Sequence, residues 1–203
     1  MILVGLLASS ASAQLLGLPI GSSAAAPGAG LMRAGASATF GDDFNMYGGR
    51  FTYGLTDELA MFADLGMFDP DDFDSALAYQ AGGTFTLPVE APVDIAARAS
   101  IGFTSTEGSE YGYKWEVDYM TLNGGILASK DFDAITPYAY VGLNHTKAEV
   151  KVRGHGSDDD DETDVALAAG VIFTVPDMPA LSFFGEVAHI DDVFFSVGGR
   201  MDL

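Results

Sequence analysis

The sequence predicts an all-β protein: a closed antiparallel up-and-down transmembrane β-barrel of ten strands, with eight strands as the alternative. Three observations predict it. Ten runs of alternating apolar and polar residues follow one another from residue 31 to the end of the chain. Clusters rich in Asp, Gly, Pro and Asn separate these runs. No apolar run reaches the roughly 18 residues that a membrane-spanning helix needs.

Each predicted strand shows this alternation and stops at a turn cluster. The strands cover residues 31–40, 46–55, 59–67, 75–87, 93–105, 116–130, 135–150, 163–175, 181–189 and 194–203. In the last one, Phe195, Val197 and Met201 fall on one face. Ser196 and Arg200 fall on the other. One face is therefore apolar and the opposite face polar.

Alternation alone also fits a soluble β-sandwich, but the predicted connections favour a membrane barrel. Short turns such as 56–58 alternate with the longer, acidic stretches 68–74, 106–115 and 151–162. Outer-membrane barrels have this asymmetry, and an even strand number returns both termini to the short-turn side. Charges of both signs in mid-strand positions also suit an enclosed polar lumen.

Composition excludes several classes of function. A chain of 203 residues fits one domain. Its net charge of −20 repels nucleic acids, so no nucleic-acid partner is expected. The absence of cysteine excludes disulfides and thiolate metal sites. No cofactor is expected.

The N-terminus indicates export. Residues 1–13 form a short apolar run ending in Ala11-x-Ala13, the small-residue pattern at which a signal peptide is cleaved. This predicts a signal peptide over 1–13, an N-terminal periplasmic segment over 14–28 and the barrel over 29–203. The positive residues that usually precede such a run are missing, so a start further upstream and a mature strand remain the alternatives.

The turn at 56–58 fixes a register. If Leu55 faces Leu59, then Arg50 lies opposite Asp64 on the neighbouring strand. A pair of this kind either gates ions or cross-links a narrow barrel, and the second interpretation is favoured because small barrels are filled by side chains. The predicted lumen charge network consists of Arg33, Arg50, Asp64, Asp94, Arg98, Glu186 and Arg200.

Two further patterns could form chemical sites. Weak divalent-cation ligands are conceivable in the acidic run Asp158, Asp159, Asp160, Asp161 and Glu162. A solvated outer loop is the favoured interpretation of that run. His189 lies close to Asp191 in sequence and is the one histidine placed for general-base work. Because no Ser/His couple or paired-acid arrangement accompanies it, the chain is not expected to be an enzyme.

Three features resemble the OmpA/OmpX-type superfamily of small outer-membrane barrels. They are Tyr53-Gly54-Leu55-Thr56-Asp57-Glu58-Leu59, Thr136-Pro137-Tyr138-Ala139-Tyr140-Val141-Gly142-Leu143, and a terminal strand that ends on an apolar residue. The resemblance covers most of residues 29–203. It implies a Gram-negative outer membrane as the location, periplasmic termini, and outer-membrane lipid and the barrel-assembly machinery as partners.

The expected function is structural or that of a narrow, porin-like pore with acidic extracellular loops. The first alternative is an adhesin or receptor that binds an extracellular ligand through loops 106–115 and 151–162. The second is an outer-membrane hydrolase that uses His189.

Overall fold

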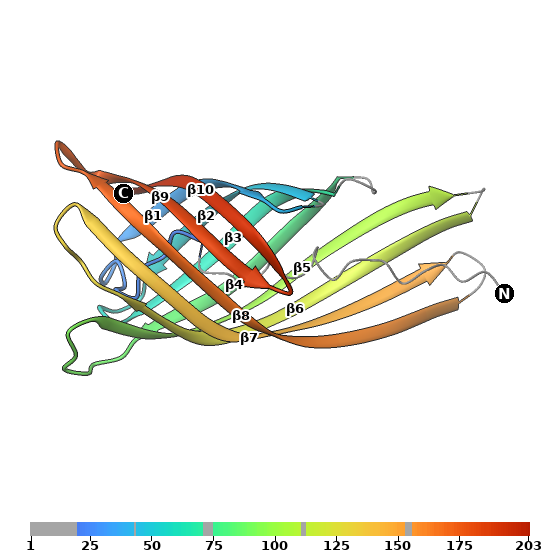
Figure 1. The fold of residues 1–203 in the computed structure, drawn as a ribbon, viewed down its shortest axis with the longest axis horizontal. Coiled ribbons are helices and arrows are strands. Elements are labelled where there is room, and N and C mark those ends of the chain that lie inside the picture. The colour runs from blue at the N-terminus through green and yellow to red at the C-terminus, as the bar shows by residue number, and fades with distance from the viewer. Residues whose placement is uncertain (1–19, 43, 71–74, 111–112, 153–155) are drawn as a thin grey trace.

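The computed structural model describes residues 20–42, 44–70, 75–110, 113–152 and 156–203. Within these residues the chain forms ten antiparallel strands that close into a barrel (Figure 1). The strands are β1 Met32–Phe40, β2 Phe44–Gly54, β3 Leu59–Pro70, β4 Ala76–Thr86, β5 Asp94–Glu110, β6 Tyr113–Ser129, β7 Ile135–Val152, β8 Gly156–Val175, β9 Met178–Ile190 and β10 Asp192–Asp202. The predicted signal peptide lies outside the described residues.

Every strand pairs with its neighbours in sequence, and β1 pairs with β10 to close the cylinder. Closure leaves the barrel wall without a free edge, so the backbone groups of the wall are hydrogen-bonded between strands. The predictions of an up-and-down barrel and of ten strands are both confirmed. No helix among the described residues is long and apolar enough to cross a membrane.

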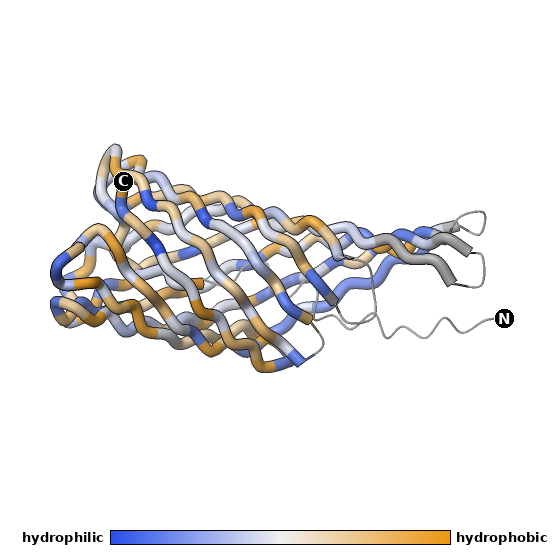
Figure 2. Tube along the Cα trace, turned by 90° about the horizontal axis from the view of Figure 1, so that it is seen from above, coloured by the Kyte–Doolittle hydropathy of each residue, from blue (hydrophilic) through white to orange (hydrophobic). Residues whose placement is uncertain are grey.

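The two faces of the wall have opposite character. Along β9, Phe184 and Glu186 are buried inside, whereas Phe183 and Val187 are about half exposed outside. The other strands repeat this alternation, and large apolar side chains cover the exterior, as in a barrel surrounded by lipid. They include Leu65, Tyr79, Val141, Leu143, Val171, Phe183 and Val197. Figure 2 shows apolar residues recurring along the barrel wall and mainly hydrophilic residues where some strands extend beyond it.

The two ends of the barrel differ. One end, here called the turn end, holds the connections 55–58, 87–93, 130–134 and 176–177, and the C-terminus lies there (Figure 1). At the opposite end, β5 to β8 continue well past the other six strands. They have 17 to 20 residues each, against 9 to 13 elsewhere.

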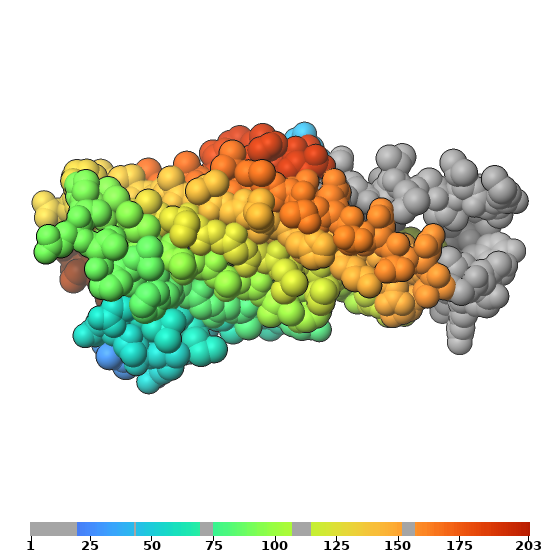
Figure 3. Space-filling model, turned by 90° about the horizontal axis from the view of Figure 1, so that it is seen from below, coloured from blue at the N-terminus to red at the C-terminus, as the bar shows by residue number. Residues whose placement is uncertain are grey.

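The prolonged ends of β5 to β8 form a four-stranded sheet, here called the extension, over residues 105–110, 113–119, 145–152 and 156–163. Paired registers run out to Glu110 opposite Tyr113 and to Val152 opposite Gly156. Figure 3 shows this part standing clear of the main body. The prediction of loops over 106–115 and 151–162 is therefore wrong: their described residues are paired strands. Residues 68–70, predicted to be loop, also belong to β3.

The extension has apolar side chains on the inner face of β6 and β7 and a charged outer face. Val117 and Tyr119 are buried there, with Trp115, Ala148 and Val150 packed against them. The outer face carries Asp118, Lys147, Glu149, Lys151 and Asp159. Because charges replace the apolar belt at this point, the extension suits water rather than hydrocarbon.

Candidate functional site

The lumen near the turn end holds a bidentate ion pair between two neighbouring strands. Arg50 Nε lies 2.7 Å from Asp64 Oδ1, and Arg50 Nη2 lies 2.7 Å from Asp64 Oδ2. The register places Arg50 directly opposite Asp64, which confirms the prediction made from the turn. Gln80 on β4 also donates a hydrogen bond to Asp64. One arginine thus links β2 to β3, and the carboxylate continues the link to β4.

A second arginine extends this cluster. The guanidinium carbon of Arg98 on β5 lies 3.9 Å from the centre of the Phe62 ring, and that of Arg50 lies 4.8 Å from the same centre. Both distances permit cation–π attraction. The ring fits because position 82 has no side chain: a Cβ at Gly82 would lie 2.4 Å from it. Arg98 is only 3% exposed.

On the opposite wall, the buried Glu186 of β9 accepts a hydrogen bond of 2.6 Å from the hydroxyl of Tyr138 on β7. Its other oxygen, Oε1, has no hydrogen-bond partner among the described residues. Tyr140, next on the inner face of β7, donates to Asn123 over 2.5 Å. Asn123 in turn donates to Asn144 over 3.3 Å. These polar contacts cross-link β6, β7 and β9 through the lumen.

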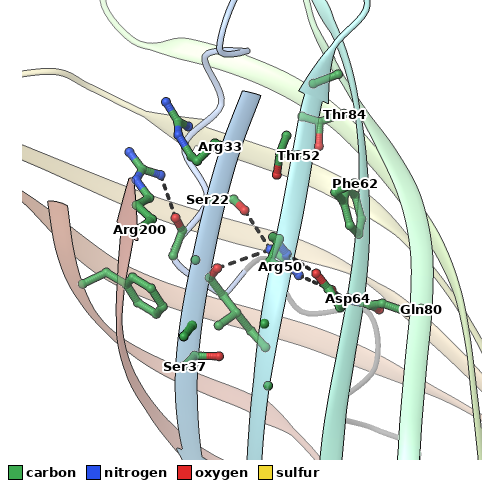
Figure 4. Close-up of a pocket in the computed structure, with 18 of the residues that line it drawn as sticks. Ser22, Arg33, Ser37, Arg50, Thr52, Phe62, Asp64, Gln80, Thr84 and Arg200 are labelled. Atoms are coloured by element: carbon green, nitrogen blue, oxygen red, sulfur yellow. Dashed lines mark hydrogen bonds and ion pairs between the residues drawn. The ribbon is translucent and has the colours of Figure 1, made fainter. Parts of the chain in front are cut away.

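Residues 20–27, which precede β1, lie inside this lumen, as Figure 4 shows in part. Arg50 Nη1 donates to the backbone oxygen of Ile20 over 3.3 Å and to Ser22 Oγ over 2.8 Å. Arg200 Nη1 donates to the backbone oxygen of Gly21 over 2.7 Å. Gly21 N donates to the Tyr138 hydroxyl over 3.1 Å. Two arginines and a tyrosine from three strands therefore hold one peptide segment.

Further contacts follow closer to the turn end. Ala24 N donates to Ser129 Oγ over 2.9 Å, and Thr86 Oγ1 donates to Ala24 O over 2.6 Å. Ala26 N donates to Thr86 Oγ1 over 3.2 Å. Residues 20–27, here called the inner segment, thus bind side chains of the barrel wall through several of their backbone groups, and such bonds let irregular chain lie inside the barrel.

Glycines let the inner segment fit and leave the lumen. Gly21 has φ +63°, and a Cβ there would lie 2.5 Å from the Phe184 ring. Gly28, with φ +98°, turns the chain at the rim, where its carbonyl approaches Gly54 so closely that a Cβ at position 54 would clash. Left-handed backbone and such close approach both favour glycine.

The cavity beside the inner segment is small. A cavity of about 80 Å³ lies between the inner segment and the wall, and its lining includes Arg50, Arg98 and Arg200. That volume holds a few water molecules. Towards the extension, Phe44 packs against Phe68 and Phe194, with ring centres 5.5 and 5.4 Å apart, and all three are buried.

The predicted lumen charge network was thus brought together in part. Arg50, Asp64, Arg98, Glu186 and Arg200 lie within the lumen. Arg33 lies at the rim of the turn end, with its Nε 2.5 Å from Asp202 Oδ1, and half of the Asp202 side chain is exposed. Asp94 was assigned wrongly: it is exposed at the first position of β5, too close to the rim to be enclosed.

Residues 20–27 were absent from the predicted site. They fall in the segment 14–28, which was expected to be periplasmic, and their run of small residues before Pro27 is the sequence feature suited to a narrow interior. Whether the turn end faces the periplasm stays a prediction.

The acidic run of the predicted cation site lies on β8, and strand geometry sends its side chains to alternate faces. Asp159 pairs with Lys147 over 3.1 Å. Among the described residues, no group of three His, Cys, Asp or Glu side chains is arranged to hold a metal ion. His189 Nδ1 lies 3.2 Å from the backbone oxygen of Asp192, not from a carboxylate.

Solved structures similar to this one are outer-membrane barrels. The translocator domain of the autotransporter NalP from Neisseria meningitidis has a TM-score of 0.55 and 12% identity, over 87% of this chain and 88% of that one. Ail from Yersinia pestis has a TM-score of 0.43 and 14% identity, over 85% and 95% of the two chains. The barrel domain of Pseudomonas aeruginosa OprF has a TM-score of 0.40 and 12% identity, over 87% and 99%.

No protein-family model matches the sequence, and no curated protein matches it. The closed ten-stranded wall, its apolar exterior and the similarity to NalP together define the fold as that of a bacterial outer-membrane β-barrel. The predicted outer-membrane β-barrel fold is confirmed.

Proposed function

We propose that this protein is a structural barrel of the bacterial outer membrane, closed to solutes, that holds the extension above the membrane on a rigid base. The observation that carries the proposal is the filled lumen. The Arg50–Asp64 ion pair links β2 to β3 inside the lumen, and the inner segment lies beside it. The cavity beside the inner segment, of about 80 Å³, is too small to serve as a channel for solutes.

The proposed orientation follows from the two ends. In bacterial barrels the short turns face the periplasm and the longer elements face outwards. The extension then lies outside the cell, and the C-terminus lies on the periplasmic side. Outer-membrane lipid would contact the apolar belt, and the barrel-assembly machinery would insert the chain. The proposal assigns no catalysis to His189 and needs no cofactor.

A conductance measurement tests the closed barrel. The full chain, folded in liposomes and transferred to planar bilayers, should give no sustained conductance steps in KCl. Folding is verified beforehand by the difference in gel migration between heated and unheated samples. Sustained steps from the folded full chain would instead support a narrow pore, and their loss or growth in Arg50→Ala would place that pore at the ion pair.

The second candidate function is binding of an extracellular partner through the extension. The observation that favours it is backbone exposure at one edge. In the described residues, the pairing of β8 with β9 begins at Leu167. The edge of β8 before this point offers backbone groups to another chain.

Shortening both hairpins tests this candidate. Variants lacking 106–115 and 151–162 should keep the heat-modified migration of the barrel and lose partner binding. Unchanged binding to host cells or matrix proteins would contradict it.

A further inference from the structure

The inner segment occupies a site built from side chains, not a gap left by packing. Arg50, Arg200 and Tyr138 bind its backbone near residues 20–22, and Ser129 and Thr86 bind it near residue 24. The groups that hold it therefore come from β2, β4, β6, β7 and β10, on all sides of the lumen.

The segment is also attached in a way that permits withdrawal. At Gly28 the chain turns with φ +98°, and at Gly30 it turns again with φ +78°. Between them, Ala29 N donates to Asp57 Oδ1 over 3.1 Å, and Gly30 N donates to Gly54 O over 2.9 Å. Ala29 and Gly30 are thus hydrogen-bonded to the end of β2 and its turn, and Gly28 lies between these bonds and the inner segment. The hydrogen bonds that hold residues 20–27 are separate from those that pair β1 with β2 and β10.

The vacated site would be rich in hydrogen-bond donors. Three guanidinium groups, those of Arg50, Arg98 and Arg200, face two carboxyl groups, those of Asp64 and Glu186. The carbonyls of Ile20 and Gly21 now accept hydrogen bonds from two of the arginines. Removal of the Gly21 carbonyl would release the donor Arg200 Nη1, and guanidinium groups bind anions through charge-assisted hydrogen bonds.

We propose that residues 20–27 are a removable plug, and that the lumen without it becomes a narrow path that binds and conducts small inorganic anions. This inference rests on the proposed closed barrel and adds an open state to it. Movement of the plug uncovers the arginine-lined part of the lumen near the turn end. The contact of Phe44 with Phe68 and Phe194 is then the remaining constriction towards the extension.

Two neighbouring alanines supply a matched pair of variants. Ala24 is fully buried between Ser129 and Thr86, whereas Ala25 is exposed. Ala24→Trp cannot fit and should expel the plug, whereas Ala25→Trp adds the same side chain where space exists. Gly21→Ala is a milder second variant, since one methyl group would meet the Phe184 ring at 2.5 Å.

The measurement uses the full chain and these variants in planar bilayers under a KCl gradient. Wild type and Ala25→Trp should stay closed. Ala24→Trp and Gly21→Ala should open at least about tenfold more often than wild type, because overpacking disfavours the plugged state. Their reversal potential should shift towards the chloride equilibrium value, and Arg200→Ala added to Gly21→Ala should reduce that shift.

A cross-link supplies the reverse test. Because the chain has no cysteine, Ala24→Cys with Ser129→Cys introduces a single possible disulfide. Added to Gly21→Ala, it should abolish openings when oxidised and restore them on reduction. Folding of each variant is verified by heat-modified migration.

The outcomes separate the two proposals. If folded Ala24→Trp and Gly21→Ala are as silent as Ala25→Trp, the removable plug is wrong and the closed barrel stands. If they open with cation preference, the anion path is wrong. If wild type conducts and the oxidised cross-link silences it, the closed barrel is wrong and the plug stands.

Discussion

The lumen and the extension use the same kind of ion pair in opposite surroundings. In the lumen, Arg50 meets Asp64 at 2.7 Å, with side chains 14% and 18% exposed. On the extension, Lys151 meets Asp118 at 2.5 Å, with side chains 44% and 35% exposed. The distances are similar, but water can replace the partner only on the extension. Access to water, not pair geometry, therefore decides what a broken pair costs.

The largest expected effect comes from breaking the lumen pair. Asp64→Ala leaves Arg50 enclosed without its carboxylate and should lower the free energy of unfolding by about 3 kcal/mol. Asp202→Ala breaks the exposed Arg33 pair at the rim and is the matched control, with a loss of about 0–1 kcal/mol. Urea unfolding in lipid vesicles, followed by the fluorescence of Trp115, measures both. Equal losses would remove the distinction between enclosed and exposed pairs.

Replacing both charged residues of the lumen pair by apolar ones tests the same comparison. The double variant Arg50→Met with Asp64→Leu removes both charges, so it should recover most of the stability lost in Asp64→Ala. If the double variant is as unstable as the single one, the lumen depends on the charges themselves and not on their balance.

A smaller effect is expected where the lumen packs tightly. A Cβ at Gly170 would lie 2.4 Å from the Tyr138 ring, whereas a Cβ at Gly185, directly opposite Val171 on the same strand pair, would meet nothing within 4 Å. Gly170→Ala should therefore cost about 1–3 kcal/mol in the same unfolding measurement. Gly185→Ala should cost less than Gly170→Ala. The reverse order would show that the Tyr138 ring moves aside freely.

The smallest effect concerns the extension. The hydrogen bond from Lys151 holds the pKa of Asp118 below its usual range, and Ser105 contributes in the same direction. The pair therefore stabilises the extension above the ordinary Asp pKa of about 3.9 and loses this contribution as pH falls through the lowered pKa. Lys151→Ala should raise the Asp118 pKa towards its ordinary value, as measured by NMR titration.

Lys147→Ala is the control for that titration, because Lys147 pairs with Asp159 on β8. It should leave the Asp118 pKa unchanged. Added salt should weaken the effect of Lys151, since exposed pairs are screened. A pKa of Asp118 that ignores Lys151 would contradict the assigned pair.

Alternation and turn spacing were enough to predict the number of strands, their inner and outer faces and the opposition of Arg50 and Asp64. These properties are local: side chains alternate with a period of two, and a short turn fixes the register of the strands that it joins. The same reasoning failed at the acidic run near residue 160, because a carboxylate-rich stretch becomes strand once β7 offers it a partner.

The content of the lumen depends on the closed barrel. The small residues of 20–27 suit a narrow interior, but their position inside depends on donors and acceptors spread over five strands, from Arg50 to Arg200. Asp94 shares the inward alternation of Arg98, yet closure leaves it at the open rim. Alternation fixes whether a side chain points inwards or outwards. How far inside the barrel it lies, and which residues fill the lumen beside it, depend on distant strands closing around a common interior.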